Sequence, residues 1–479
     1  MGRPEEAAEC YRGGRPIGLQ TTLPNGWQTQ ADQAAPVHRY AEPVNDRSRV
    51  ADPDELPATT SSARSTGGLT TRQRRLLLIA IALFVVSAIV SWAAHIWTGY
   101  IDLQVYRNGA RTWLDGGDLY GPMPKVYGIG LPFTYPPLAA LFFAPLALMP
   151  LAVAQWLVLL TSMASLAVTL WLVLVRIRPE MDRSTRVILL IGALAVLGLS
   201  EPVRQTYNFG QINLILMAAV ALDALVRKPF WPRGMLIGIT VAVKLIPAGY
   251  LLYFLLRRDW RACLTLIGSA IGAIALAYLL FPHDSTEYWF HTLIDTGRIG
   301  PPQYAGNQSL KGFAFRLGVS DGAATAIWIG LSLIAIGLAA LWMKRLLDAG
   351  HQVSALLVNS AAVLLVSPVS WSHHWVWVAP ALLVAGDLIA RMPAADAPDT
   401  PGRAARRRRM WIAITAVITV LFMVGPQWVL PHNADRELRW AWWQQIIGSS
   451  YVLVTFAALV IAAIAYRPSG VRNAASAAE

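Results

Sequence analysis

Long apolar runs alternate with short polar segments along most of the chain. Each run covers about 15–23 residues, the length that an α-helix needs to cross about 30 Å of hydrocarbon. The runs are continuous and show no two-residue alternation, which favours helices over a β-barrel. We therefore predict an all-α, polytopic membrane helix bundle. The predicted full spans are 76–98, 153–175, 187–200, 211–226, 261–281, 322–343, 353–368, 374–390, 411–430 and 446–466.

Two further apolar segments, 135–150 and 234–256, are interrupted. The first contains four prolines, and as a helix it would be about 24 Å long, less than the hydrocarbon thickness. The second contains Lys244 and ends at Arg257-Arg258, so both of its ends carry a cytoplasmic signature. We predict two broken elements beside ten full spans, or twelve crossings if both cross. Broken helices are tolerated where they line a cavity.

Arginines in the short loops set the predicted topology. Arg72, Arg74 and Arg75 precede the first span and place the N-terminus in the cytoplasm. Counting spans from there brings four polar motifs to the outer face, and we predict a reaction or binding site there, facing the periplasm from the plasma membrane. These motifs are Asp102, Glu201–Arg204, Asn307–Lys311 and Ser372–His374.

Composition divides the chain into three parts. Residues 1–70 are rich in Pro, Gly, Ser, Thr and charge, and we predict a disordered cytoplasmic tail. Residues 71–470 form the transmembrane domain, and 471–479 form a short cytoplasmic tail. The chain of 479 residues is 55% hydrophobic and only 14% charged. Its net charge of +12 lies mostly in short loops, so we attribute it to topology and exclude nucleic acid as a partner.

Residues 102–114 predict an amphipathic helix at the membrane surface. Two interpretations of Asp102, at its start, remain open at this point. The carboxylate could only cap free N–H groups of the helix, or it could act as a base in a cleft between the outer loops. The predicted polar side of the helix carries Gln104, Arg107, Asn108 and Arg111, and the other side carries Leu103, Tyr106, Ala110, Trp113 and Leu114.

Other polar residues near the span ends are candidates for the same site. Glu201 and Arg204, spaced i, i+3, either pair with each other or leave the arginine to bind a lipid phosphate. Tyr135 lies in FTYPPLAAL, either a plain helix start or a cavity wall. Gln211 and Asn213 begin the following span and are expected to project into the same cavity.

Adjacent His373 and His374 are expected to point to different sides of a helix, so at most one binds substrate. Lys244 is costly in an apolar run, and its place nearer the cytoplasmic side favours a structural or lipid-phosphate role over catalysis. No spacing of His, Cys or Glu offers the three or four converging ligands of a zinc site, and we predict no metal. The chain also lacks a P-loop, GxGxxG, HExxH and a paired DxD segment.

Six segments in order carry a family resemblance over about residues 76–466. The chain resembles glycosyltransferase family 87 of the GT-C membrane superfamily, the actinobacterial polyprenol-phosphate-mannose-dependent α-(1→2)-mannosyltransferases. The segments are IDLQVYRNGARTWLDGGDLY, LPFTYPPLAALFFAPLALMP, EPVRQTYNFGQINLILMA, GITVAVKLIPAGYLLYFLLRRDWR, NQSLKGF and SPVSWSHHWVW.

The resemblance implies an inverting transfer of mannose from polyprenyl-phosphate-mannose to a hydroxyl of a lipid-anchored mannoside or mannan. The acceptor is a phosphatidylinositol mannoside or lipomannan, and no cofactor or metal is required. Asp102 matches the catalytic acidic residue of the first outer loop. Asp115 and Asp118 lie in a Gly-rich turn, where an aspartate usually bonds to the local backbone, and they rank below Asp102. The implied donor-phosphate and substrate ligands are Arg204, Lys311 and His374, with Arg107 in reserve, and His373, Glu201, Tyr135, Gln211 and Asn307 around them.

Two other functions are weighed against this one. An arabinosyltransferase of the same superfamily would use a pentose donor. A transporter or flippase of a lipid-linked sugar would also have broken helices and polar residues at membrane depth. The absence of an internal inverted repeat, and polar motifs at one face instead of the midplane, favour the enzyme.

Overall fold

The structure is a computed structural model that describes residues 68–392 and 402–466. The described residues form helices and loops, with two isolated bridges as their only β-type pairing. The predicted all-α membrane helix bundle is therefore confirmed. The predicted tails, 1–70 and 471–479, lie outside the described residues except for 68–70.

The first half of the described chain contains ten α-helices and one 3₁₀-helix. They are α1 (Thr71–Ala93), α2 (Ile101–Leu114), α3 (Leu138–Leu148), α4 (Leu151–Ile177), α5 (Arg183–Leu197), α6 (Glu201–Phe209), α7 (Asn213–Leu225), α8 (Met235–Val241), η1 (Ile246–Tyr250), α9 (Leu251–Leu256) and α10 (Trp260–Leu280).

The second half continues with further long helices and several short 3₁₀ or π turns. They are α11 (Pro282–Glu287), η2 (Tyr288–Thr292), η3 (Thr296–Ile299), α12 (Leu310–Arg316), α13 (Asp321–Asp348), α14 (Gln352–Val366), η4 (Ser372–Trp377), α15 (Val378–Ala390), α16 (Arg403–Val424), η5 (Pro426–Trp428), η6 (Arg436–Arg439), α17 (Trp442–Gly448) and α18 (Ser450–Ala465).

Within the described ranges, five helices are long and apolar enough to cross a membrane, and up to seven spans result if two helix pairs bent by 77° each count as one. The bent pairs are α5 with α6 and α17 with α18. Both segments predicted to be broken are broken: α3 has only 11 residues, and 234–256 divides into α8, η1 and α9. The predicted number of crossings stays a prediction. The five long candidates are Thr71–Ala93, Leu151–Ile177, Trp260–Leu280, Asp321–Asp348 and Ser372–Ala390.

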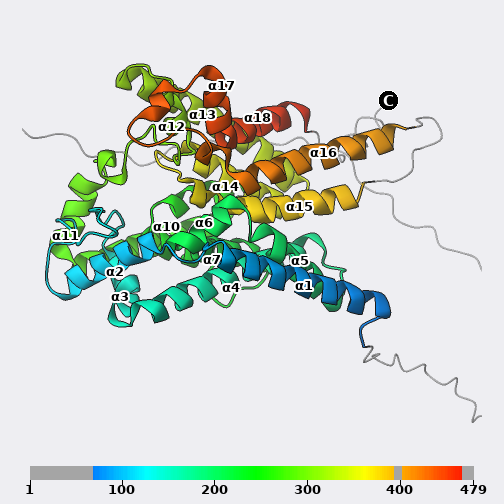
Figure 1. Ribbon diagram of the computed structural model, residues 1–479, viewed down its shortest axis with the longest axis horizontal. Coiled ribbons are helices and arrows are strands. Elements are labelled where there is room, and N and C mark those ends of the chain that lie inside the picture. The colour runs from blue at the N-terminus through cyan, green and yellow to red at the C-terminus, as the bar shows by residue number, and fades with distance from the viewer. Residues whose placement is uncertain (1–67, 393–401, 467–479) are drawn as a thin grey trace, which may run out of the picture. The chain divides into compact units, whose positions relative to one another are not determined.

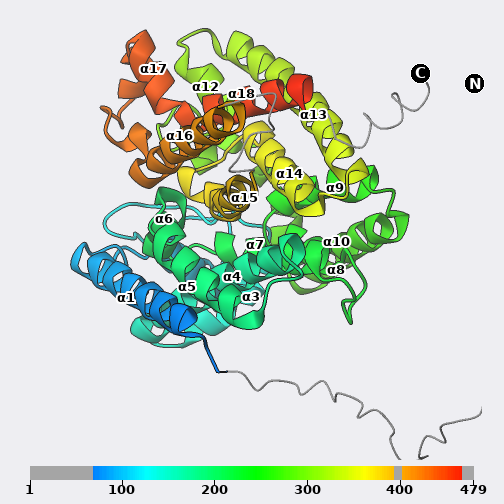
Figure 2. The same ribbon diagram turned by 90° about the vertical axis from the view of Figure 1, so that its right-hand side faces the viewer.

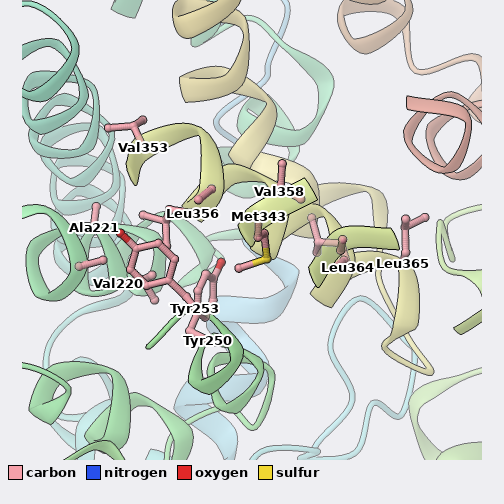
Figure 3. Close-up of a cluster of buried hydrophobic side chains, with 14 of the residues drawn as sticks. Val220, Ala221, Tyr250, Tyr253, Met343, Val353, Leu356, Val358, Leu364 and Leu365 are labelled. Atoms are coloured by element: carbon pink, nitrogen blue, oxygen red, sulfur yellow. The ribbon is translucent and has the colours of Figure 1, made fainter. Parts of the chain in front are cut away.

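The helices pack in two groups, one formed by α1 to α8 and the other by α12 to α18, as the view from one end of the bundle shows (Figure 2). Between the groups, Tyr250 and Tyr253 lie among aliphatic side chains of α7 and α14, such as Val220 and Leu356 (Figure 3). In Figure 1, α2 and α11 lie together at the left end of the bundle. Burial of these apolar faces joins the groups into one core.

Arginine side chains satisfy the free carbonyl groups at several helix C-termini. Arg233 donates to the carbonyls of Asp223 and Ala224 at the end of α7, and Arg345 donates to that of Ala463 in α18. The positive charge also complements the negative end of the helix dipole. Several arginine side chains are therefore already hydrogen-bonded to backbone carbonyls.

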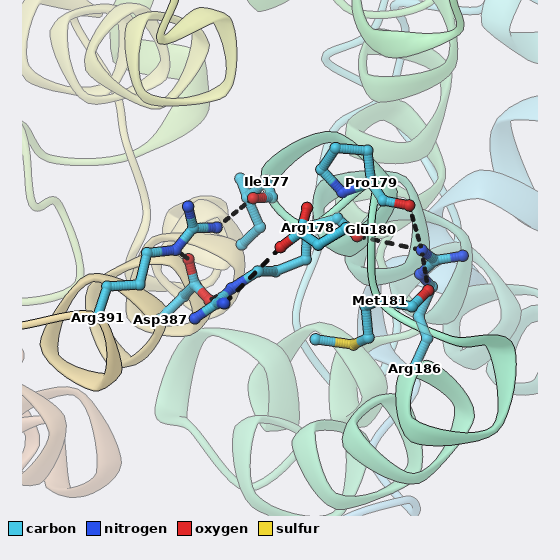
Figure 4. Close-up of polar contacts among 8 residues, drawn as sticks. All are labelled: Ile177, Arg178, Pro179, Glu180, Met181, Arg186, Asp387 and Arg391. Atoms are coloured by element: carbon cyan, nitrogen blue, oxygen red, sulfur yellow. Dashed lines mark hydrogen bonds and ion pairs between the residues drawn. The ribbon is translucent and has the colours of Figure 1, made fainter.

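Asp387 joins the ends of α4 and α15 (Figure 4). Its carboxylate pairs with the guanidinium of Arg178 at 2.6 Å and with that of Arg391 at 2.9 Å. Arg391 also donates to the carbonyl of Ile177, the last residue of α4. This carboxylate therefore pairs with two arginines and fixes one pair of helix ends.

Candidate active site

The start of α2 is fixed against the end of α6. The backbone N–H of Tyr100 and that of Gly99 donate to the carbonyl and side-chain oxygens of Asn208. Tyr100 adopts a left-handed conformation with φ of 46°, which is unfavourable for a tyrosine and typical of functional sites. The result is a helix whose first residues lie beside the connection between α6 and α7.

Gly210 in that connection allows the close approach. It has φ of 67°, and a Cβ there would lie 2.8 Å from the Cβ of Leu103 and 3.0 Å from the ring of Tyr100. Both the backbone conformation and the space therefore require glycine. The next residue, Gln211, is thereby placed against the first turn of α2.

Asp102 does not cap α2. The helix begins at Ile101 after Tyr100, without a side-chain cap, and Asp102 instead accepts a hydrogen bond from Gln211, Nε2 to Oδ2, at 2.9 Å. The capping interpretation is therefore wrong. The side chain is half-buried, and burial raises the pKa of Asp102 to about 6, with smaller opposing effects from Gln211 and the charge of Lys244. A carboxylate of this kind is suited to accept a proton near neutral pH.

Gln211 is itself oriented by two tyrosines. The hydroxyl of Tyr106 donates to Oε1 of Gln211 at 2.7 Å and lies 2.9 Å from the hydroxyl of Tyr135. Because the tyrosine donates to the amide oxygen, the amide NH₂ faces the carboxylate of Asp102. The predicted participants Tyr135 and Gln211 thus meet Asp102 in one hydrogen-bonded cluster.

Lys244 belongs to the same cluster, which the sequence-based placement nearer the cytoplasmic side did not anticipate. It lies in the break between α8 and η1, and its Nζ donates to Oδ1 of Asn213 at 2.8 Å. The same Nζ lies 3.3 Å from Nε2 of His374 and 5.4 Å from the ring centre of Tyr135. The break in the helix leaves the ammonium group among polar partners instead of lipid.

The two adjacent histidines lie together in η4, in contrast to the expected opposite orientations. Their ring centres are 4.9 Å apart, and both rings are buried. Since an ammonium group only donates, Nε2 of His374 accepts from Lys244 and the proton of the neutral ring lies on Nδ1. Nδ1 of His374 and Nε2 of His373 are buried with no hydrogen-bond partner in the described part of the chain.

A small, open pocket lies beside Lys244, Asn213 and His374. Its remaining wall is mainly apolar. This combination, a cationic and polar end with an apolar wall, suits an amphiphilic ligand that carries an anionic group. The other lining residues are Leu216, Met217, Val220, Ile246, Pro247, Tyr250, Ser360, Val363, Leu364, Val376 and Trp377.

Glu201 and Arg204 are not paired as an i, i+3 ion pair. Glu201 is fully buried and accepts hydrogen bonds from Ser372 at 2.6 Å, Trp428 at 2.7 Å and Tyr451 at 2.9 Å. The guanidinium of Arg204 donates to backbone carbonyls, including those of residues 423 and 424 at the end of α16. Both residues connect elements of the fold through these bonds.

Arg107, Asn307 and Lys311 also have local partners. Arg107, expected on the exposed side of α2, is only 8% exposed and donates to the carbonyls of residues 146 and 149 at the end of α3. The amide of Asn307 is fully buried and bonds to Pro302, Pro368 and Ser370. Nζ of Lys311 lies 5.2 Å from the ring centre of Trp328. Their predicted roles in substrate binding stay predictions.

The predicted polar motifs lie close together, and the membrane face on which they lie stays a prediction. Thr206 in α6 donates to the carbonyl of His373, and Asn213 at the start of α7 donates to the same oxygen. The segment around Asn307 pairs with Trp371 just before η4. The motifs containing Asp102, Glu201, Asn307 and His373 therefore come together at one end of the bundle.

Comparisons with known proteins identify the family of the chain. The model of glycosyltransferase family 87 matches residues 133–368, a range that includes Tyr135, Gln211 and Lys244. A polyprenol-phosphate-mannose-dependent α-(1-2)-phosphatidylinositol mannoside mannosyltransferase of Mycobacterium tuberculosis is 39% identical over 391 residues, which cover 78% of this chain and 87% of that protein. The chain belongs to glycosyltransferase family 87.

Other relatives of this family 87 glycosyltransferase are more distant. A polyprenol-phosphate-mannose-dependent α-(1-2)-phosphatidylinositol pentamannoside mannosyltransferase of Mycolicibacterium smegmatis is 32% identical over 83% of this chain and 94% of that protein. An α-(1->3)-arabinofuranosyltransferase of Corynebacterium glutamicum is 27% identical over 46% of this chain and 50% of that protein. No solved structure gives a significant match.

Sequence reasoning predicted Gln211 and Asn213 but missed two members of the cluster. Tyr106 was assigned to the packing side of α2, although its hydroxyl orients Gln211. Lys244 was placed toward the other membrane face. The signal for Lys244 was the cost of a lysine in an apolar run, which requires a polar cavity around it.

Proposed function

We propose that this family 87 glycosyltransferase transfers mannose from polyprenyl-phosphate-mannose to a hydroxyl of a phosphatidylinositol mannoside, and forms an α-(1→2) linkage. The observation that carries the proposal is the half-buried carboxylate of Asp102, held by Gln211 within electrostatic range of Lys244. One cluster thus offers a proton acceptor and a cation. The relatives that match most of the chain carry the same donor and acceptor classes in their names.

In the proposed reaction, the acceptor hydroxyl oxygen attacks the anomeric carbon from the face opposite the phosphate. The bond from that carbon to the phosphate oxygen breaks, and its electron pair leaves with the polyprenyl phosphate. The proton of the attacking hydroxyl passes to Asp102. A β-linked donor then gives an α-linked product, which is inversion.

The leaving phosphate gains charge as the bond breaks, and a cation is needed where that charge develops. We assign this role to Lys244, and to the Nδ1–H of His374 as a neutral donor. Arg204 and Arg107 are less suited, because their guanidinium groups already bind backbone carbonyls. The apolar wall of the adjoining pocket suits the first isoprene units of the donor.

The same positions favour a site that faces the periplasm. Asn213 and Lys244 lie at the end of the bundle where α7 begins, whereas the basic loop around Arg227 and Arg233 follows the other end of α7. Basic loops stay in the cytoplasm, so the cluster lies on the opposite side of the plasma membrane.

Purified protein in detergent provides the test, with radiolabelled polyprenyl-phosphate-mannose and either phosphatidylinositol mannosides or lipomannan as acceptor. We expect labelled mannose to appear on the mannosides in an α-(1→2) linkage, established by linkage analysis and by the anomeric proton signal of the product. Transfer to lipomannan but not to the mannosides would show that lipomannan, and not a phosphatidylinositol mannoside, is the acceptor. A polyprenyl-phosphate-arabinose donor that reacts where the mannose donor does not would favour the arabinosyltransferase and overturn the proposal.

A further inference from the structure

At the end of the bundle opposite Asp102, four arginines from three segments come together. Arg176 lies in the last turn of α4, Arg227 and Arg233 lie in the connection between α7 and α8, and Arg257 follows α9. The last three act electrostatically on Arg176. We refer to these four residues as the inner arginine cluster.

Hydrogen bonds hold two members of the cluster in place. The guanidinium of Arg176 donates to the side-chain oxygen of Gln352, the first residue of α14. Arg257 donates to the hydroxyl of Tyr253 at 3.2 Å, with its guanidinium carbon 5.2 Å from the ring centre, and that hydroxyl donates to the carbonyl of Gln352 at 3.5 Å. Gln352 thus connects to Arg176 directly, and to Arg257 through the hydroxyl of Tyr253. Both arginines are half-buried.

The carboxylate of Asp223 acts electrostatically on Arg233, but its oxygens accept hydrogen bonds from Trp231 and from backbone N–H groups, and it forms no ion pair with the cluster. Within residues 68–392 and 402–466, none of the ion pairs involves Arg176, Arg227, Arg233 or Arg257. The electrostatic neighbours of Arg176 are three cations and Tyr253. Held like charges that are partly removed from water repel one another, and an anion relieves that cost.

The neighbouring helix end contains arginines that do form ion pairs with a carboxylate. Only two residues after Arg176, Arg178 pairs with Asp387, which also binds Arg391 (Figure 4). The inner arginine cluster also lies at helix ends, but none of its four guanidinium groups forms an ion pair with a carboxylate of the described residues. We therefore expect a bound ligand to supply the negative charge.

Exposed aromatic side chains beside the cluster favour a lipid as the source of that anion. Phe230, between Arg227 and Arg233, is 97% exposed, and Trp260, near Arg257, is 60% exposed. Aromatic side chains of this kind lie at membrane interfaces, at the depth of lipid headgroups. The planar fork of a guanidinium matches the oxygens of a phosphate, and basic pockets between helices on the cytoplasmic side bind anionic headgroups.

We propose that Arg176 and Arg257, with Arg227 beside them, bind the headgroup phosphate of an anionic phospholipid in the leaflet opposite the transfer site. Arg233 contributes charge but no direct bond, because it is occupied by the carbonyls at the end of α7. The site is distinct from the proposed donor site around Lys244, and it does not depend on the identity of the transferred sugar.

The experiment is native mass spectrometry of the full-length, delipidated protein, titrated with phosphatidylglycerol, phosphatidylinositol or zwitterionic phosphatidylcholine. We compare wild type with Arg176→Gln/Arg257→Gln and with the control Arg258→Gln/Arg261→Gln, which removes two exposed arginines from the same end. We expect the first pair to weaken binding of both anionic lipids by about tenfold or more, and the control by less than about twofold. Binding of phosphatidylcholine is expected to be weak in all three proteins.

Equal binding of anionic and zwitterionic lipid, or equal losses in both double variants, would overturn the proposal, since a diffuse surface charge gives those results. Millimolar inorganic phosphate that displaces the lipid and binds alone would also overturn it, in favour of a soluble phosphate ligand. Arg227→Gln, at an exposed position where folding is not at risk, is expected to weaken anionic lipid binding by about threefold. No effect of this change would contradict its place in the site.

Discussion

Two acidic residues near the same end of the bundle, Asp102 and Glu201, have opposite surroundings. Glu201 is completely buried, and both of its oxygens accept hydrogen bonds from neutral donors of three other segments. Asp102 is half-buried, and its carboxylate has one donor among the described residues, Gln211.

This difference separates a structural carboxylate from a chemical one. The oxygens of Glu201 are occupied by Ser372, Trp428 and Tyr451, so it joins α6, η4, η5 and α18 but has little capacity left for a proton or a substrate. Asp102 keeps one oxygen available. A base needs such an accessible oxygen and a pKa near the working pH, and only the surroundings of Asp102 provide both.

The largest effect is expected from Asp102→Asn. The amide keeps the shape of the side chain but accepts no proton, so the transfer rate should fall by roughly 10²–10⁴-fold while donor affinity stays within about threefold. Single-turnover transfer of radiolabelled mannose measures the rate, and a binding titration with the donor measures the affinity. A variant that transfers mannose at close to the wild-type rate would assign the base elsewhere.

Lys244→Met tests the cationic side of the cluster. Loss of a charge-assisted contact to the donor phosphate should weaken donor binding or transfer by roughly 10–100-fold. The matched control is Lys311→Met, since that ammonium lies over Trp328 and is expected to change transfer by less than about threefold. If the Lys311 variant lost more activity than the Lys244 variant, Lys311 and not Lys244 would be the ligand of the donor phosphate.

Gln211→Leu tests a positioning residue. Its hydrogen bond lowers the pKa of Asp102, so removal should raise that pKa and move the acid limb of the pH–rate profile to higher pH. Loss of orientation should also reduce kcat by about tenfold, with little change in KM. A lower kcat with an unmoved acid limb would indicate a packing defect instead. Gln211→Asn, which can keep one amide donor, is expected to recover part of both effects.

Glu201→Gln should have the smallest effect on the transfer rate. One amide NH₂ would face donors instead of acceptors, which costs about 1–3 kcal/mol of folding free energy. The rate per folded molecule should remain within about threefold of wild type. Thermal unfolding in detergent and the rate of the folded fraction measure the two quantities. A stably folded variant whose transfer rate is reduced by about 10²-fold would show that Glu201 also takes part in the reaction, and would contradict its purely structural role.

The sequence predicted the helical bundle, the two broken elements and the meeting of the outer motifs, because long apolar runs and loop arginines determine these features. It also indicated a backbone role for Asp118, whose carboxylate accepts from the N–H of Tyr120. It did not predict which polar groups meet inside the cluster. The apolar periodicity of α2 assigned Tyr106 to a buried face but gave no information on the partner of its hydroxyl.

The positions predicted from the number of arginines in each loop were less accurate. These counts gave Lys244 a cytoplasmic position, since both ends of 234–256 carry basic residues or lie beside them. The structure instead bends this segment at the break after α8, which brings Lys244 to Asn213 and His374. Likewise, Arg107 and Arg204 looked free to bind phosphate, because sequence spacing does not reveal the carbonyls at the ends of α3 and α16.

The pH dependence of kcat/KM for wild-type transfer tests the role of Asp102 most directly. The base must be deprotonated, and its pKa is raised to about 6, so activity should be lost as pH falls through about 6, at about tenfold per pH unit below it. The phosphodiester of the donor keeps its single charge over this range. A profile that stays flat from about pH 7 down to about pH 4.5 would contradict Asp102 as the proton acceptor.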